Sequence, residues 1–171
     1  MNATTTHDFK ERLDYSWSTT HDPFWAAVYA KAFPNMVNAM PCERDGEHQR
    51  MGIDRVVLLD NGQILKIDEK KRESEYNDIL LEYVSVDTTG APGWIEKNLA
   101  IDYLAYAFPN SKRCYLFPWP FLRRAWKQNG EQWKRQYKRV EAQNKGYKTI
   151  SVAVPINVLY AAVNRATRVD I

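Results

Sequence analysis

The stretch IDRVVLLDNGQILKIDEKK, residues 53 to 71, decides the fold because it encodes a β-hairpin with charged residues at its open end. Two apolar runs, Val56 to Leu59 and Ile64 to Ile67, flank Asp60-Asn61-Gly62, a combination typical of a tight turn between antiparallel strands. The first strand begins beside Asp54, and the second ends at Asp68-Glu69-Lys70. Since a hairpin places these ends side by side, the sequence predicts that acidic side chains meet across neighbouring strands.

The length of the turn decides which side chains meet, and the sequence leaves two registers open. A three-residue turn with a left-handed glycine places Asp54 opposite Asp68, with Lys70 on the same face. A two-residue turn places Asp54 opposite Glu69, and the active pair becomes Glu69 and Lys71, because a one-residue slip exchanges the faces of a strand. The apolar alternation in the second strand slightly favours the two-residue turn. We select Asp68 and Lys70 as the active pair.

Carboxylates that converge in this way have a specific chemical use. They can hold Mg²⁺, which prefers oxygen ligands and keeps several waters. The metal would neutralise phosphate charge and help to generate hydroxide from a bound water. A lysine on the same face can orient or deprotonate that water, or stabilise the charge that develops. Asp54, Asp68 and Lys70 are therefore candidate catalytic residues of a phosphodiester-hydrolysing site.

An acid, a hairpin and then acid-x-lysine, in element order α-β-β-β-α-β, resembles the PD-(D/E)XK nuclease superfamily. The matching residues are Ile53-Asp54 and Asp68-Glu69-Lys70. The chain also resembles small uncharacterised proteins encoded by phages and prophages. The resemblance implies that Asp54 and Asp68 bind Mg²⁺ or Mn²⁺ with help from the main-chain carbonyl of Glu69, that Lys70 is catalytic, and that the fold is restriction-endonuclease-like.

Apolar periodicity and turn residues predict the remaining elements. They indicate one α/β domain over residues 1–171, with a mixed sheet flanked by helices. Four helices are predicted: Asp8 to Trp17, Pro23 to about Pro34, one from Phe121 that kinks or divides at Asn129-Gly130, and one from Ile156. Residues 42–50 are predicted to form a loop. The further predicted strands are Ile79 to Val86, Leu99 to Phe108, Cys114 to Phe117 and Thr149 to Val154.

Further candidate residues lie outside the motif. Glu82 is either a third metal ligand or an ordinary strand residue that faces solvent. Between residues 120 and 150 there are nine Lys or Arg but only two acids, a local balance of +7. Arg123, Lys127, Lys134 and Lys138 follow helical spacing there and either contact nucleic-acid phosphates or form a solvated helix face.

Composition bounds the remaining function classes. Two cysteines without metal-ligand spacing exclude a disulfide framework, and the sequence has neither a Gly-rich phosphate loop nor a G-x-S-x-G elbow. No N-terminal apolar run suggests a signal peptide or a membrane partner, so we expect a cytoplasmic protein, in a bacterial host or phage-infected cell. We expect a nuclease acting on nucleic acid, with DNA preferred by family analogy, and a homodimer if both strands are cut. The alternatives are an inactive nucleic-acid-binding or phage–host interaction module on the same fold, or a subunit of a phage assembly.

Overall fold

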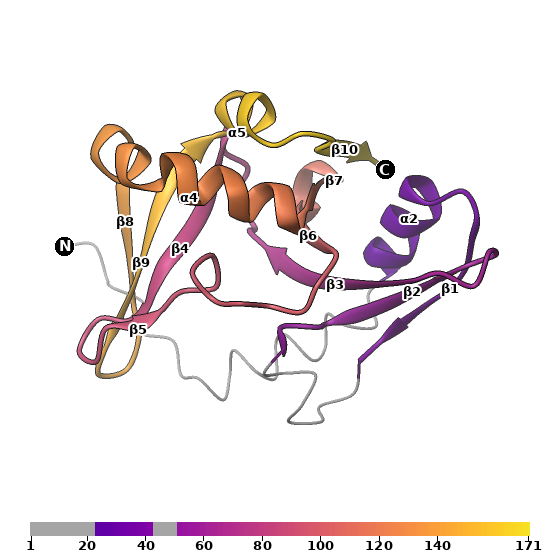
Figure 1. Cartoon of the computed structure of the whole chain (residues 1–171), viewed down its shortest axis with the longest axis horizontal. Helices are drawn as coiled ribbons and strands as arrows, with labels where there is room; N and C mark the ends of the chain where they lie inside the picture. The colour runs from indigo at the N-terminus through magenta and orange to yellow at the C-terminus, as the bar shows by residue number, and fades with distance from the viewer. Residues whose placement is uncertain (1–22, 43–50) are drawn as a thin grey trace.

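The computed structural model describes residues 23–42 and 51–171, which form a mixed α/β structure of two sheets and three α-helices (Figure 1). The helix predicted at 8–17 and most of the predicted loop at 42–50 lie outside the described residues. In the described part of the chain, no helix combines the length and the apolar character needed to cross a membrane. The elements are α2 (Pro23–Ala32), β1 (Met36–Pro41), β2 (Arg55–Leu59), β3 (Ile64–Lys71), β4 (Asp78–Val86), β5 (Ala91–Pro92), β6 (Tyr103–Phe108), the 3₁₀ turn η1 (Pro109–Ser111), β7 (Arg113–Pro118), α4 (Trp119–Gln136), β8 (Arg139–Gln143), β9 (Lys148–Pro155), α5 (Ile156–Ala162) and β10 (Thr167–Asp170).

The strands form two sheets where the sequence predicted one. The larger has the order β1-β2-β3-β6-β7-β10, with β3 and β6 parallel and every other neighbouring pair antiparallel. The smaller is antiparallel throughout, with the order β5-β4-β9-β8. The strand that follows the hairpin, β4, therefore leaves the hairpin's sheet and pairs with β9.

The β2–β3 hairpin adopts the register of a three-residue turn. Leu59 N–H donates to Gln63 O at 2.9 Å, and Gly62 has a left-handed φ of 81°. Arg55 pairs with Ile67, so the next pair toward the open end is Asp54 opposite Asp68. The alternative register, with Glu69 and Lys71 as the active pair, is wrong.

The two faces of the larger sheet are buried by different partners. On one face, α2 packs Trp25, Val28 and Tyr29 against a cluster that includes Leu65 and Ile67. The opposite face joins a second cluster, which contains residues of β4, β9, α4 and α5. In Figure 1, α2 lies over β1 to β3, while α4 and α5 lie with the smaller sheet. Asp54, Asp68 and Lys70 belong to the face that points away from α2, because side chains alternate along a strand.

Helix α4 differs from its prediction. It runs without a break from Trp119 to Gln136, so the kink predicted at Asn129-Gly130 is wrong. A β-carbon added at Gly130 would lie 3.0 Å from the Trp126 indole, so the glycine lets this ring pack on the helix backbone. The helix ends before Tyr137, whose backbone is extended, and Lys138 therefore lies outside it.

The strand predictions were confirmed for β4, β7 and β9 to within a residue at each end, and α5 begins at Ile156 as predicted. The strand predicted from Leu99 begins only at Tyr103. Four of the described strands were not predicted, namely β1, the two-residue β5, β8 and β10.

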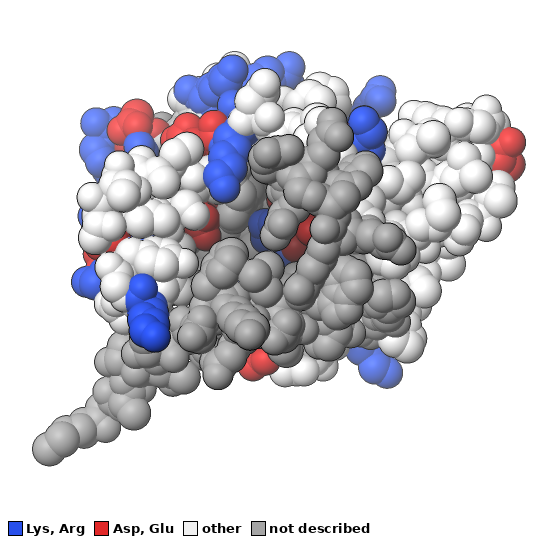
Figure 2. Space-filling model, turned by 90° about the horizontal axis from the view of Figure 1, so that it is seen from below, with Lys and Arg blue, Asp and Glu red and all other residues white. Residues whose placement is uncertain are grey.

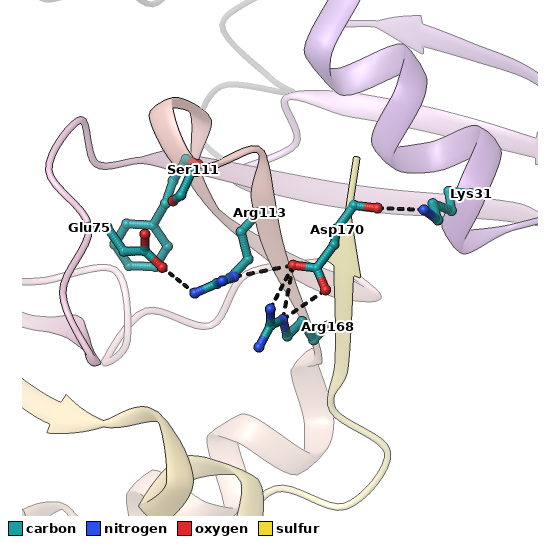
Figure 3. A network of polar contacts seen from close by, with 7 residues as sticks. Lys31, Glu75, Ser111, Arg113, Arg168 and Asp170 are labelled. Atoms are coloured by element: carbon teal, nitrogen blue, oxygen red, sulfur yellow. Dashed lines mark hydrogen bonds and ion pairs between the residues drawn. The ribbon is translucent and has the colours of Figure 1, made fainter.

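The last strand, β10, is fixed to the sheet edge by a polar network (Figure 3). Asp170 accepts from Arg113 Nε at 3.2 Å and from Arg168 Nε at 2.9 Å, while Arg113 also pairs with Glu75. The main-chain oxygen of Asp170 accepts from Lys31 Nζ at 2.6 Å, which ties β10 to α2. The network thus closes the end of the sheet that lies farthest from the hairpin.

Gly93 allows a loop to approach β4 closely, and its substitution is expected to destabilise the protein. A β-carbon there would lie 2.2 Å from the main-chain oxygen of Glu82, so the loop or the strand would have to move. We expect Gly93→Ala to lower the free energy of unfolding by about 1–3 kcal/mol. Urea unfolding of wild type and Gly93→Ala measures this. A free energy of unfolding that is unchanged or raised in the variant would refute the packing explanation.

Candidate active site

Asp54 and Asp68 are brought together by the hairpin. Backbone bonds hold Asp54 from both sides: its N–H donates to Ile67 O at 2.9 Å, and its carbonyl accepts from Cys42 N–H at 2.9 Å. Its carboxylate accepts from the main-chain N–H of Glu69 at 2.7 Å. The Asp54 carboxylate lies close enough to Asp68 to raise the pKa of that residue, and only 2% of the Asp68 side chain is exposed. The structure therefore places one buried and one partly exposed carboxylate close together.

Lys70 completes this cluster from the next position on the same strand face. Its ammonium donates to Asp68 Oδ1, and 32% of its side chain remains exposed. Burial alone would lower the pKa of Lys70, but the negative charges of Asp68, Asp54 and Glu82 outweigh it and raise the pKa above its ordinary value. The charged form of this lysine is thus favoured by three carboxylates.

The ionised form of the buried Asp68 carboxylate is electrostatically unfavourable in this cluster. The pKa of Asp68 is raised to about 8: burial raises it most, the Lys70 ammonium lowers it, and the nearby Asp54 carboxylate raises it. The Lys70 ammonium therefore does not offset the cost of ionising the buried Asp68. A second positive charge at this point would favour the ionised form.

The next side chain along the strand, Glu69, lies on the opposite face, beneath α2. Its carboxylate accepts from Arg55 Nε at 2.5 Å and from the Tyr29 hydroxyl at 2.8 Å. The side chains of Arg55 and Glu69 are only 5% and 8% exposed. Lys71 lies on this face too, with Nζ 5.5 Å from the centre of the Trp25 ring. Glu69 can therefore offer the cluster only its main chain.

Arg55 and Tyr29 were missed by the sequence analysis. Strand alternation alone could have identified Arg55, because it lies opposite Ile67 and so shares a face with Glu69 once the register is known. Tyr29 gave no comparable signal, since its place on a helix face does not reveal which strand residue it meets.

Glu82 lies on β4, in the smaller sheet, close enough to Lys70 to raise the pKa of that lysine. A loop packs directly against it: Gly93 N–H donates to Tyr83 O at 3.0 Å, and Ile95 N–H donates to Glu82 O at 3.2 Å. Trp94 in this loop is buried and lies 6.5 Å from Trp119, ring centre to ring centre, so it anchors the loop. On the face shown in Figure 2, acidic and basic atoms lie together in a recess near the middle of the molecule.

The four basic residues predicted to bind nucleic acid occupy different environments. Arg123 donates to the carbonyl of Ile95 and is half-buried beside Trp119. Lys134 pairs with Glu131 and lies over the ring of Tyr83, 5.2 Å from its centre. Lys127 and Lys138 are exposed. Two of the four cations therefore hold the structure together, and two face solvent.

The donor set suits a divalent cation of the Mg²⁺ type. Within residues 23–42 and 51–171, no three His, Cys, Asp or Glu side chains gather as a group that could hold a metal ion. Mg²⁺ commonly binds through one or two carboxylates, with waters and substrate phosphates filling its other positions. Asp54 and Asp68 supply carboxylate oxygens close to one another, and this pair fits such an ion.

No protein-family model, curated protein or solved structure matches this chain.

Proposed function

We propose that this protein is a metal-dependent nuclease that hydrolyses phosphodiester bonds in nucleic acid, on a restriction-endonuclease-like fold and with DNA as the preferred substrate. The observation that carries the proposal is the three-residue register of the hairpin, because it gathers Asp54, Asp68 and Lys70 on one face. The other register would have separated them. Support also comes from the raised pKa of Asp68, which is buried close to a second carboxylate, because strongly shifted pKa values are common at functional sites.

The roles of the residues follow from their positions. Asp54 and Asp68 would hold Mg²⁺ or Mn²⁺, with the main-chain carbonyl of Glu69 as an additional donor and Glu82 acting from β4 in the smaller sheet. The bound ion would lower the pKa of a coordinated water and neutralise phosphate charge. Lys70, held in its charged form, would orient the attacking water or donate to an anionic oxygen of the phosphate. Lys127 and Lys138 would contact the nucleic-acid backbone beyond the site.

The proposal is tested with purified full-length protein and several substrates: single-stranded, duplex and branched DNA, and RNA. We expect cleavage in Mg²⁺ or Mn²⁺ and none in EDTA. Lys70→Gln should lower kcat by about 10²–10³-fold, because it removes a charged donor from the reacting phosphate. Lys71→Gln is the matched control, since the adjacent lysine lies on the α2 face of the strand; it should retain kcat within about twofold.

The outcomes separate the proposal from its alternative. Equal cleavage by wild type and Lys70→Gln would mean a contaminating nuclease or a different site. Nucleic-acid binding that EDTA does not weaken, without cleavage of any substrate, would identify an inactive binding module and overturn the enzymatic proposal.

A further inference from the structure

The candidate site has an excess of negative charge, and the proposed nucleic-acid substrate is negatively charged as well. Among the described residues, Asp54, Asp68 and Glu82 lie near one cation that acts on all three, Lys70. One divalent ion would balance these side chains, but every phosphate of a nucleic-acid strand adds a further negative charge. Phosphates on either side of the cleaved bond would therefore need cations at the margin of the site. Arg123 and Lys134 do not meet this need, because they are engaged with the Ile95 carbonyl and with Glu131.

Lys66 lies at this margin, on the same strand face as the catalytic candidates. Leu65 and Ile67 point into the cluster beneath α2, so Lys66 points the other way, as Asp68 does. Two residues along a strand span about 7 Å. Pairing of β3 with β6 begins only at Ile67, and Lys66 is exposed where the hairpin extends past β6. The Asp102 carboxylate accepts from its main-chain N–H at 2.7 Å and fixes its position.

Lys97 lies at the margin for a different reason, because the loop that carries it follows the edge of the site. The loop begins at Ile95, bonded to the carbonyl of Glu82, and ends at Asp102, whose N–H donates to Lys66 O at 2.7 Å. Between these anchors, Leu99 packs against Gly52, where an added β-carbon would lie 3.0 Å from a Leu99 methyl carbon. Gly52 precedes Asp54 by two residues. The exposed segment 96–98 therefore runs from Glu82 toward Asp54.

Both lysines are available for a ligand. Within the described residues, neither ammonium forms a hydrogen bond or an ion pair with another side chain or carbonyl. The strand that presents Lys66 and the loop that presents Lys97 are fixed through backbone bonds, so the cations could be used without reorganisation of the backbone.

We propose that Lys66 and Lys97 bind the backbone phosphates of a nucleic-acid strand that flank the cleaved phosphodiester. This inference rests on the proposed nuclease function. It assigns substrate positioning to two residues outside the acid–acid–lysine motif and outside the basic helix. Because the contacts are to phosphate, they would be independent of base sequence.

The test compares Lys66→Gln, Lys97→Gln and the double variant with Lys112→Gln. Lys112 is an exposed lysine at the η1–β7 turn, beyond the opposite end of β3, and serves as the matched control. Binding of labelled single-stranded and duplex DNA is measured in EDTA at several salt concentrations, and cleavage kinetics are measured in Mg²⁺. Each single variant should raise Kd and KM by about 3–10-fold, leave kcat within about twofold, and reduce the slope of log K against log salt by about 1. The double variant should reduce that slope by about 2.

The outcomes distinguish this inference from the proposed function. Normal cleavage by wild type, with Kd and salt slope unchanged in both lysine variants, would overturn the phosphate contacts and leave the nuclease proposal standing. Weakened binding in these variants but not in Lys112→Gln, with no cleavage by any form, would support the contacts and overturn the catalytic proposal. A loss confined to kcat would overturn the positioning role.

Discussion

Asp68→Asn is expected to abolish cleavage and, at the same time, to make the folded protein more stable, by an amount that grows as the pH rises. Cleavage should fall by at least about 10³-fold, because the variant would lose one of the two proposed metal ligands. The gain in stability comes from the removal of a buried charge: burial raises the pKa of Asp68 from its ordinary value of 3.8 to about 8.

The sign of the pH dependence follows from proton binding. Between about pH 4 and pH 8 the folded protein holds a proton on Asp68 that the unfolded chain has lost, so the free energy of unfolding of the wild type falls as the pH rises. This loss is complete above the raised pKa. Asparagine does not titrate. The free energy of unfolding of Asp68→Asn therefore exceeds that of the wild type by an amount that grows through this window and then levels off at about 2 kcal/mol or more.

Thermal unfolding in EDTA across this pH range measures the effect. At pH 8 the Tm of Asp68→Asn should exceed that of the wild type by several degrees. Mg²⁺ should raise the Tm of the wild type and leave that of Asp68→Asn unchanged, because an ion stabilises only the state that binds it. Asp60→Asn, at the exposed turn of the same hairpin, is the control and should follow the wild type. A Tm difference between Asp68→Asn and wild type that stays constant with pH would contradict the buried-charge explanation.

The site could be predicted from the sequence because its parts lie within one hairpin. A local turn fixes which residues of β2 and β3 meet, and the motif residues lie within 17 positions of one another. The apolar alternation nevertheless favoured the wrong register. It assumes one buried face, whereas both faces are buried at Asp68, which is only 2% exposed beside the fully buried Ile67.

Long-range pairing could not be predicted in the same way. The apolar pattern of β4 predicts a strand, but it does not predict that this strand pairs with β9, about 70 residues later. Glu82 therefore could not be placed beside Lys70, and Lys97 gave no signal because its position depends on three tertiary contacts.

Helix α4 shows how packing can override a local signal. Asn-Gly is typical of a turn, yet Asn129 donates to the Ala125 carbonyl at 2.9 Å and Gly130 supports the Trp126 ring. Conversely, the basic residues followed helical spacing as far as Lys138, although the backbone is extended at Tyr137 and Lys138 lies outside the helix. Spacing alone did not detect this end of the helix.

The largest loss of stability is expected when one partner of the buried Arg55–Glu69 ion pair, on the α2 face of the hairpin, is replaced. Arg55→Met would leave the Glu69 carboxylate under α2 with only the Tyr29 hydroxyl as a side-chain donor. Removing one partner of a buried pair costs about 3–5 kcal/mol, because the remaining charge is desolvated without compensation. Replacing both, in Arg55→Met/Glu69→Met, should cost less than Arg55→Met alone, since no buried charge is then left.

Urea unfolding of both single variants and the double variant forms a double-mutant cycle that measures this coupling. The matched control is Arg139→Met, which breaks a pair with Glu141 whose side chains are 57% and 37% exposed and should change stability by less than about 1 kcal/mol. The pair also has a functional consequence, because the main-chain N–H of Glu69 holds the Asp54 carboxylate. Arg55→Met should therefore weaken Mg²⁺ binding even at temperatures where the variant is fully folded. Equal costs for Arg55→Met and Arg139→Met would show that the pair does not hold the strand beneath the site.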